Sequence, residues 1–219
     1  MKQLRVLCGC ECSGVVRDAF LRRGHDAWSC DLKPSERPGP HLQCNVLDIL
    51  YMGWDLAIFH PDCQYITCSA EWAYGDGPYH QKVKPGTLVG AARRAARVRA
   101  IEFAKMLWNA GIPKIALENP VGVLSRAENL GKPAQVIQPY NFGEDASKAT
   151  CLWLKNLPPL VPTTYCEPRI VIDANGKPQK RWANQTASGQ NRLSPGESRS
   201  QDRSRTYQGI AEALAAQWG

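Results

Sequence analysis

The chain has 219 residues, of which 43% are hydrophobic, and a formal net charge of +7. A chain of this size can bury a core without disulfides or metal ions, and we expect one main domain. No apolar run approaches the roughly 18 residues that a membrane span needs. The first residues also lack the apolar region of a signal peptide. We therefore expect a soluble, cytoplasmic protein.

The nine cysteines are odd in number, and no two of them have C-x-x-C spacing. This pattern argues against a disulfide framework and a zinc ribbon, and favours reduced thiols. The densest group is Cys8, Cys10 and Cys12, which alternate at the end of an apolar run. Such spacing suits small buried residues at least as well as metal ligands, and we predict no metal site.

The positive charge favours an anionic partner such as nucleic acid, but many proteins without one are equally basic. The basic residues gather in two groups. The first consists of Arg93, Arg94, Arg97 and Arg99, and the second of Lys177, Lys180, Arg181, Arg192, Arg199, Arg203 and Arg205. Each group fits either a solvated face or a surface that contacts phosphates.

Short apolar runs alternate with helical patterns along the chain, which predicts an α/β domain with a largely parallel sheet. Gly24 should end the first helix, and the second should bury Ala96, Ala104 and Leu107 while its arginines lie elsewhere. Proline and polar residues indicate irregular structure at 156–204. The expected strands are 4–8, 27–30, 55–59, 114–117, 134–138 and 150–154, and the expected helices are 15–23, 88–110 and 210–218.

A glycine-bearing turn joins the first strand to the first helix, and the second strand ends in Asp31. In Rossmann-like folds such a turn lets a ligand approach the backbone, while the acid accepts hydrogen bonds from a ribose. The strict G-x-G-x-x-G pattern is absent. The stretch therefore fits either a nucleotide or adenosyl site or a plain strand-turn-helix unit.

Two further strand ends carry reactive side chains, in the sequences HPDCQ (60–64) and ENP (118–120). Ligands of open α/β sheets bind beyond the carboxyl ends of the strands, so Cys63 and Glu118 are expected to face one crevice. Each residue also has a plainer interpretation. Cys63 could be an inert buried thiol, and Glu118 could cap a turn.

The order of these motifs, a glycine turn with a downstream acid, then Pro-x-Cys-Gln, then Glu-Asn-Pro, resembles the DNA cytosine-5 methyltransferases. It is most similar to the short members encoded by phages and prophages. The resemblance runs from Leu4 to Trp218. It implies a Rossmann-like methyltransferase fold with helices on both faces of the sheet, in a bacterial or phage-infected cell.

The resemblance implies that Cys63 adds to carbon 6 of cytosine, which makes carbon 5 nucleophilic, and that Glu118 stabilises charge near N3. The implied cofactor is S-adenosylmethionine and the implied partner is DNA, either a duplex with a flipped cytosine or a single strand. The base that removes the carbon-5 proton is not identified. The implied cofactor-binding residues are Gly9, Ser13, Gly14, Asp31, Asp48 and Pro61, and the implied substrate-binding residues are Gln64, Asn119 and Lys148. Asp48 fits a helix N-cap equally well.

The chain departs from the family pattern at three places. Asp62 replaces a second proline before the cysteine, and such an acid raises the pKa of the thiol unless it is paired or points away. Lys148 and Thr150 stand where two arginines are usual. Only residues 156–204 remain for target recognition, which suits relaxed specificity or single strands.

We accordingly divide the chain into a catalytic core that binds S-adenosylmethionine (1–155), a short basic recognition segment (156–204) and a C-terminal helix that packs back on the core (205–219). Two alternatives stay open. One is a related enzyme that modifies another pyrimidine or uses another one-carbon donor, and the other is a non-catalytic DNA-binding protein of the same fold.

Overall fold

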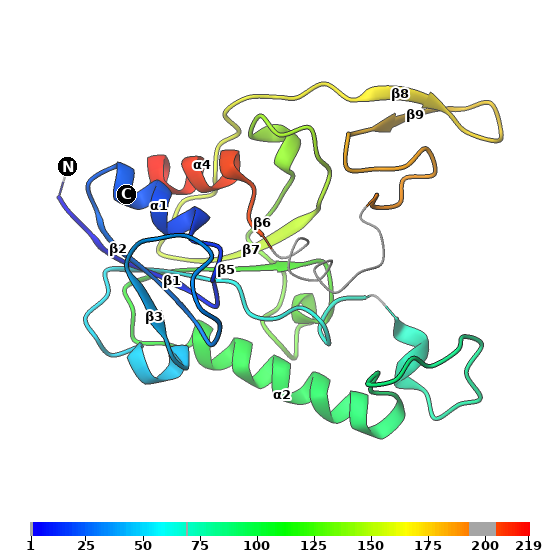
Figure 1. Cartoon of the computed structure of the whole chain (residues 1–219), viewed down its shortest axis with the longest axis horizontal. Coiled ribbons are helices and arrows are strands. Elements are labelled where there is room, and N and C mark those ends of the chain that lie inside the picture. Colours follow the sequence, from blue (N-terminus) through cyan, green and yellow to red (C-terminus); the bar gives the residue numbers. More distant parts are fainter. Residues whose placement is uncertain (1, 69, 193–204) are drawn as a thin grey trace.

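The structure is a computed structural model that describes residues 2–68, 70–192 and 205–219 (Figure 1). Its centre is a seven-stranded sheet in the order β3-β2-β1-β4-β5-β7-β6. The pairs from β3 to β5 are parallel, and β7 is antiparallel to both of its neighbours. The strands are β1 (Arg5–Gly9), β2 (Asp26–Asp31), β3 (His41–Gln43), β4 (Leu56–Phe59), β5 (Lys114–Pro120), β6 (Gln135–Ile137) and β7 (Thr150–Lys155). This arrangement confirms the predicted Rossmann-like α/β fold.

Helices cover both faces of the sheet (Figure 1). Helices α1 and α4 pack on one face, where Phe20 and Leu214 share a buried cluster with Ile58. Helix α2 covers the other face, where Leu107 packs in a second buried cluster with Phe59. The helices are α1 (Val15–Arg22), α2 (Gly90–Trp108) and α4 (Gln208–Trp218), with 3-10 turns η1 (Val46–Ile49), η2 (Glu71–Tyr74), η3 (Val123–Ser125) and η4 (Pro139–Asn141).

A glycine lies at each end of α1. Gly14 is its N-cap with φ 72°, and Gly24 follows its last turn with φ 83°. Residues with a Cβ rarely adopt this left-handed backbone, so glycine is favoured at both positions. The predicted end of the helix at Gly24 is confirmed.

Two of the four arginines of α2, Arg93 and Arg97, differ from the prediction that they lie away from the core. Arg93 is buried, and its guanidinium lies 4.7 Å from the ring centroid of Tyr74. Arg97 lies 3.4 Å from the same centroid and pairs with Glu71 at 2.6 Å. These two side chains hold Tyr74 and Glu71 against the helix through cation–π and ionic contacts.

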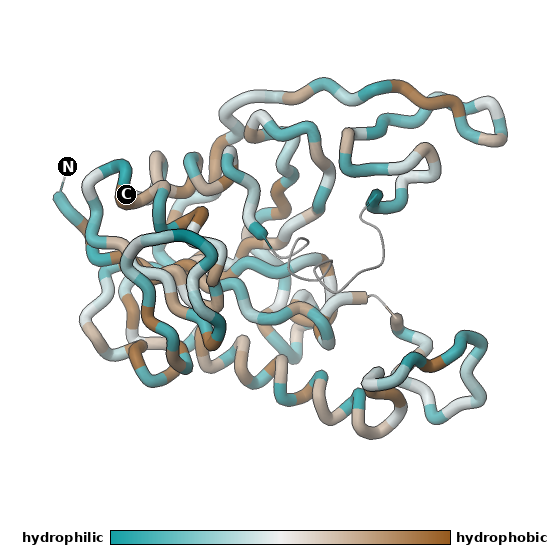
Figure 2. Tube along the Cα trace, in the orientation of Figure 1, coloured by the Kyte–Doolittle hydropathy of each residue, from teal (hydrophilic) through white to brown (hydrophobic). Residues whose placement is uncertain are grey.

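The segment predicted to be irregular contains a hairpin of β8 (Arg169–Ile172) and β9 (Pro178–Arg181). The hydrophobic β8 projects from the body of the molecule (Figure 2). Trp182, which follows β9, is buried and stacks on Tyr140 with ring centroids 4.1 Å apart. This stack anchors the hairpin. The basic residues Arg199 and Arg203 lie outside the described residues.

No helix in the described part of the chain is long and apolar enough to cross a membrane. The same residues contain no group of three or more histidine, cysteine, aspartate or glutamate side chains that could hold a metal ion.

Candidate active site

The cysteine and glutamate motifs follow neighbouring strands at one edge of the sheet. Strands β1, β4 and β5 are parallel neighbours with Gly9 opposite Phe59 and Phe59 opposite Leu117. The next residue on β5 is Glu118, and the chain after β4 continues into the loop that carries Cys63. The strand pairing thus brings the two motifs together from positions more than fifty residues apart.

Direct contacts join the cysteine loop to the chain after Glu118. The Asn119 side chain is buried and its Nδ2 donates a hydrogen bond of 2.8 Å to the carbonyl of Pro61. The Val123 N–H donates to the carbonyl of Ile66 at 2.8 Å, and Thr67 forms a β-bridge with Gly122. Asn119, predicted to contact substrate, therefore fixes the loop that presents Cys63.

Gly122 makes this close approach possible. Its φ is −178°, which any residue can adopt, but an added Cβ would overlap the carbonyl oxygen of Ile66. We expect Gly122→Ala to destabilise the fold by about 1–3 kcal/mol and to displace the cysteine loop, because backbone cannot move aside cheaply. Urea denaturation should report the change in stability. Gly111→Ala, where the added Cβ meets nothing within 4 Å, is the control. Equal effects of the two substitutions would contradict this account of the loop contact.

Asp62 shapes the same loop. Its side chain is exposed, and Oδ1 accepts a hydrogen bond of 3.0 Å from the N–H of Gln64. This Asx-turn spans Cys63 and restricts the local backbone, as a proline would by other means. The Asp62 carboxylate is therefore exposed and hydrogen-bonded to the backbone of its own loop.

Cys63 lies in a partly buried position in the first turn of this loop. Its carbonyl accepts hydrogen bonds from the N–H groups of Ile66 and Thr67, at 3.2 and 3.0 Å. The side chain packs at the border of the cluster that contains Phe59 and Leu117. The loop backbone is therefore held on both sides of the thiol.

Glu118 forms an ion pair that the sequence did not predict. His60 Nδ1 lies 3.1 Å from Glu118 Oε2, and the two side chains are only 11% and 12% exposed. Burial alone would lower the pKa of His60, but the charge and hydrogen bond of Glu118 outweigh it and raise the pKa above 6.5. Burial alone would raise the pKa of Glu118, but His60 holds it below 4.5. Both groups are therefore charged over a shared range of pH.

This pair predicts a pH-dependent stability. The raised pKa of His60 stabilises the fold fully below pH 6.5 and loses its effect as the pH rises through the folded value. The lowered pKa of Glu118 stabilises it above pH 4.5 and loses its effect as the pH falls. We expect Glu118→Gln to cost about 1.5–3 kcal/mol between these limits, as for a hydrogen bond to a charged group, and less outside them.

Urea denaturation across this pH range measures the difference between the wild type and Glu118→Gln. Glu102→Gln is the control, because the exposed pair of Glu102 with Lys105 contributes little. A Glu118→Gln difference that is constant with pH would contradict the ionised pair.

The glycine turn after β1 contains a buried carboxylate. Glu11 Oε1 accepts hydrogen bonds from the hydroxyl of Ser13 and, at 3.2 Å, from the N–H of Val15, while Oε2 is buried with no hydrogen-bond partner among the described residues. Gly9 allows close packing against Phe59, since a Cβ there would lie 2.6 Å from the Phe59 ring. A ligand with a cationic group would satisfy the free oxygen of Glu11.

The two predicted acids differ in their surroundings. Asp31 ends β2 and is partly buried, and its Oδ1 accepts a hydrogen bond of 2.9 Å from the N–H of Lys33. Asp48 is exposed within η1. The N-cap of η1 is Asn45, whose side chain accepts from Leu47, so the alternative that Asp48 caps this turn is wrong.

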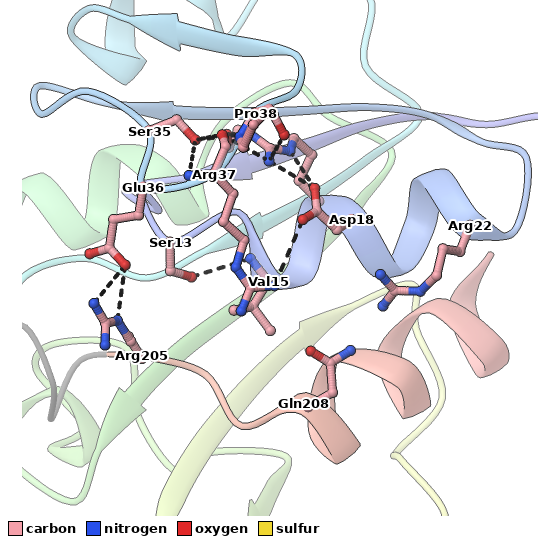
Figure 3. Close-up of polar contacts among 12 residues, drawn as sticks. Ser13, Val15, Asp18, Arg22, Ser35, Glu36, Arg37, Pro38, Arg205 and Gln208 are labelled. Carbon is pink, nitrogen blue, oxygen red and sulfur yellow. Dashed lines mark hydrogen bonds and ion pairs between the residues drawn. The ribbon is translucent and has the colours of Figure 1, made fainter.

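A buried arginine organises the loop that follows Asp31. Arg17 on α1 is fully buried, pairs with Asp18 at 2.8 Å, and donates to the hydroxyls of Ser29 and Ser35, each at 3.1 Å. Figure 3 shows Ser35 and Pro38 above Asp18, and Glu36 of the same loop directed at Arg205. Glu36 and Arg205 pair at 2.8 Å, which joins this loop to the chain before α4.

Lys148 and Gln64, the other two residues predicted to bind substrate, differ in their relation to the pair of His60 and Glu118. Lys148 precedes β7, its N–H donates to the side chain of Gln138 at 2.9 Å, and its positive charge acts on both His60 and Glu118. Gln64 is exposed on the cysteine loop. Only Lys148 therefore has an electrostatic connection to the pair.

No protein-family model matches the chain, and no curated protein matches it. Among solved structures it is similar to a crystal structure described as that of a proposed DNA modification methyltransferase encoded within a prophage (E. coli). The TM-score is 0.43 and the sequence identity 11%, over 75% of this chain and 52% of that chain, so the match spans about half of that protein. A likeness this distant assigns no function.

Proposed function

We propose that the protein is an S-adenosylmethionine-dependent DNA cytosine-5 methyltransferase in which Cys63 is the nucleophile and Glu118 stabilises the target ring. The observation that carries this proposal is the hydrogen bond from the Asn119 side chain to the Pro61 carbonyl, which holds the cysteine loop beside the end of β5. A thiol and a carboxylate from separate strands are thereby brought to one edge of the sheet.

The chemistry requires both groups. Carbon 5 of cytosine is a weak nucleophile, so the Cys63 thiolate forms a bond to carbon 6, and the electrons of the ring double bond become available at carbon 5. As they shift, N3 takes up a proton at the Glu118 carboxyl group. After methylation the proton on carbon 5 leaves to a base, the double bond re-forms, and the bond between sulfur and carbon 6 breaks to release Cys63.

The residues of the glycine turn fit the proposed cofactor. S-adenosylmethionine supplies a methyl group on a sulfonium and carries an ammonium group as well. The buried Oε2 of Glu11, which has no hydrogen-bond partner among the residues that the structure describes, offers a negative charge to such a cation, and Ser13 and Gly14 shape the turn beside it. Asp31 at the end of β2 is placed for a ribose, as in other Rossmann-like sites. We also propose that Gly9, Asp48 and Pro61 contribute to this cofactor site.

Target recognition is proposed for residues 156–204, with the core in residues 1–155 and the closing segment in 205–219. The hairpin of β8 and β9 carries exposed Ile170 and Ile172 together with basic residues. A two-stranded ribbon of this kind can enter the major groove of a duplex. Since Trp182 is buried against Tyr140, it is not free to stack on a base.

Mass spectrometry of nucleosides tests this function. DNA of random sequence, duplex or single-stranded, is incubated with the protein and S-adenosylmethionine and then digested. We expect 5-methylcytosine from at least one form of DNA. Modification of another pyrimidine would favour the related pyrimidine enzyme, and salt-dependent DNA binding without any methylated nucleoside would favour the non-catalytic binding protein.

A further inference from the structure

The ionised state of Glu118 poses a problem for the proposed reaction. A carboxylate only accepts hydrogen bonds, and N3 of neutral cytosine is also an acceptor. The two groups cannot bind each other unless a proton lies between them. Because His60 holds the pKa of Glu118 below its usual value, this proton must come from a neighbour of Glu118.

His60 is placed to be that neighbour. It follows β4 directly, opposite Glu118, and its N–H donates to the carbonyl of Gly9 at 3.0 Å, which fixes the backbone. Its side chain is mostly buried, and Nδ1 faces Glu118 Oε2 at 3.1 Å. The other ring nitrogen, Nε2, is buried without a hydrogen-bond partner among the described residues. In that part of the chain, the contact with Glu118 is the one hydrogen bond that the ring makes.

We propose that His60 is a positioning residue that orients the carboxyl group of Glu118 and supplies it with the proton that N3 of cytosine receives. This inference rests on the proposed function. When the sulfur of Cys63 bonds to carbon 6, the imidazolium of His60 gives its Nδ1 proton to the Glu118 carboxylate, and Glu118 gives a proton to N3. His60 ends neutral and Glu118 remains a carboxylate. Elimination of Cys63 reverses the transfer.

Three charged groups from three elements face His60. Glu118 on β5 and Glu11 in the turn after β1 favour the imidazolium, and Lys148 before β7 opposes it. The two carboxylates prevail, so His60 carries a proton at the pH at which a free histidine begins to lose it. A positively charged ring beside Glu118 is therefore ready before the substrate arrives.

Two substitutions separate this role from simple packing. His60→Gln can still donate a hydrogen bond to Glu118, but it has no proton to give. Glu118→Gln removes the negative charge from its neighbour. His80→Gln is the matched control, because His80 is an exposed histidine. Circular dichroism and binding of S-adenosylmethionine by calorimetry establish that each variant is folded.

The first readout is independent of activity. The protein has four histidines, so NMR can follow each imidazole as the pH changes. We expect one of them, absent from the spectrum of His60→Gln, to titrate above the ordinary range and to fall below it in Glu118→Gln. A His60 ring that titrates identically in the wild type and in Glu118→Gln would overturn the proposal.

The second readout is the rate of covalent trapping on DNA that contains 5-fluorocytosine. We expect His60→Gln to trap about 10²-fold more slowly, as for the loss of a proton-transfer group, and to lack the decline in rate that the wild type shows as His60 deprotonates. A wild-type rate and pH profile in His60→Gln would refute the role. Absence of any adduct with the wild type would instead refute the proposed function and with it this role, whatever the titration shows.

Discussion

Replacing Cys63 by alanine is expected to abolish methyl transfer while leaving the fold intact. The thiol lies at the border of a buried cluster, and the loop around it is held by backbone contacts that alanine keeps. Loss of the nucleophile should lower the rate by ~10³-fold or more, which corresponds to about 4 kcal/mol of transition-state stabilisation. Transfer of a labelled methyl group from S-adenosylmethionine to DNA measures this effect.

Cys68→Ala is the matched control for this substitution. Cys68 is an exposed thiol five residues further along the same loop, and we assign it no role. The control should methylate DNA at the wild-type rate. If Cys63→Ala kept substantial activity, or if both variants lost it equally, Cys63 would not be the nucleophile.

Arg17→Met should produce the largest loss of stability. The guanidinium is fully buried, and it satisfies two hydroxyls, the carbonyl of Pro38 and the carboxylate of Asp18. Removal of one partner from a buried pair leaves polar groups unpaired and costs about 3–5 kcal/mol. Urea denaturation should show this cost. The affinity for S-adenosylmethionine should fall as well, since the loop after Asp31 loses its anchor.

Arg22→Met tests whether burial is the cause. Arg22 lies on the same helix and pairs with Glu212 on α4, but both side chains are largely exposed. An exposed pair contributes about 0–1 kcal/mol, so this variant should stay close to the wild type. Similar losses in the two variants would mean that the network around Arg17 is not what stabilises the loop.

The alternation of apolar runs and helical patterns was sufficient to predict the fold. Strand β4, before HPDCQ, is buried on both faces and is one apolar run. The residues 115–117 of β5 are likewise apolar and buried. Parallel strands end at one edge, so the position of Cys63 and Glu118 on that edge followed from sequence. The short β3 and the β8–β9 hairpin were missed, because their runs are brief and interrupted by polar residues.

The contacts that depend on register and loop path were beyond sequence reasoning. His60 meets Glu118 only because β4 pairs with β5 so that Phe59 lies opposite Leu117. Arg17 is buried because the loop of residues 32–40, between β2 and β3, folds over it. The arginines of α2 likewise meet Tyr74 from a segment whose course the sequence does not indicate.

Trapping of Cys63 by 5-fluorocytosine tests the central claim most directly. Fluorine at carbon 5 cannot leave as a proton, so the bond between the cysteine and carbon 6 persists after methylation. The account predicts that, with S-adenosylmethionine present, mass spectrometry finds the modified nucleotide on the peptide that contains Cys63. An adduct on another cysteine, or methylation of DNA without any trapped protein, would contradict it.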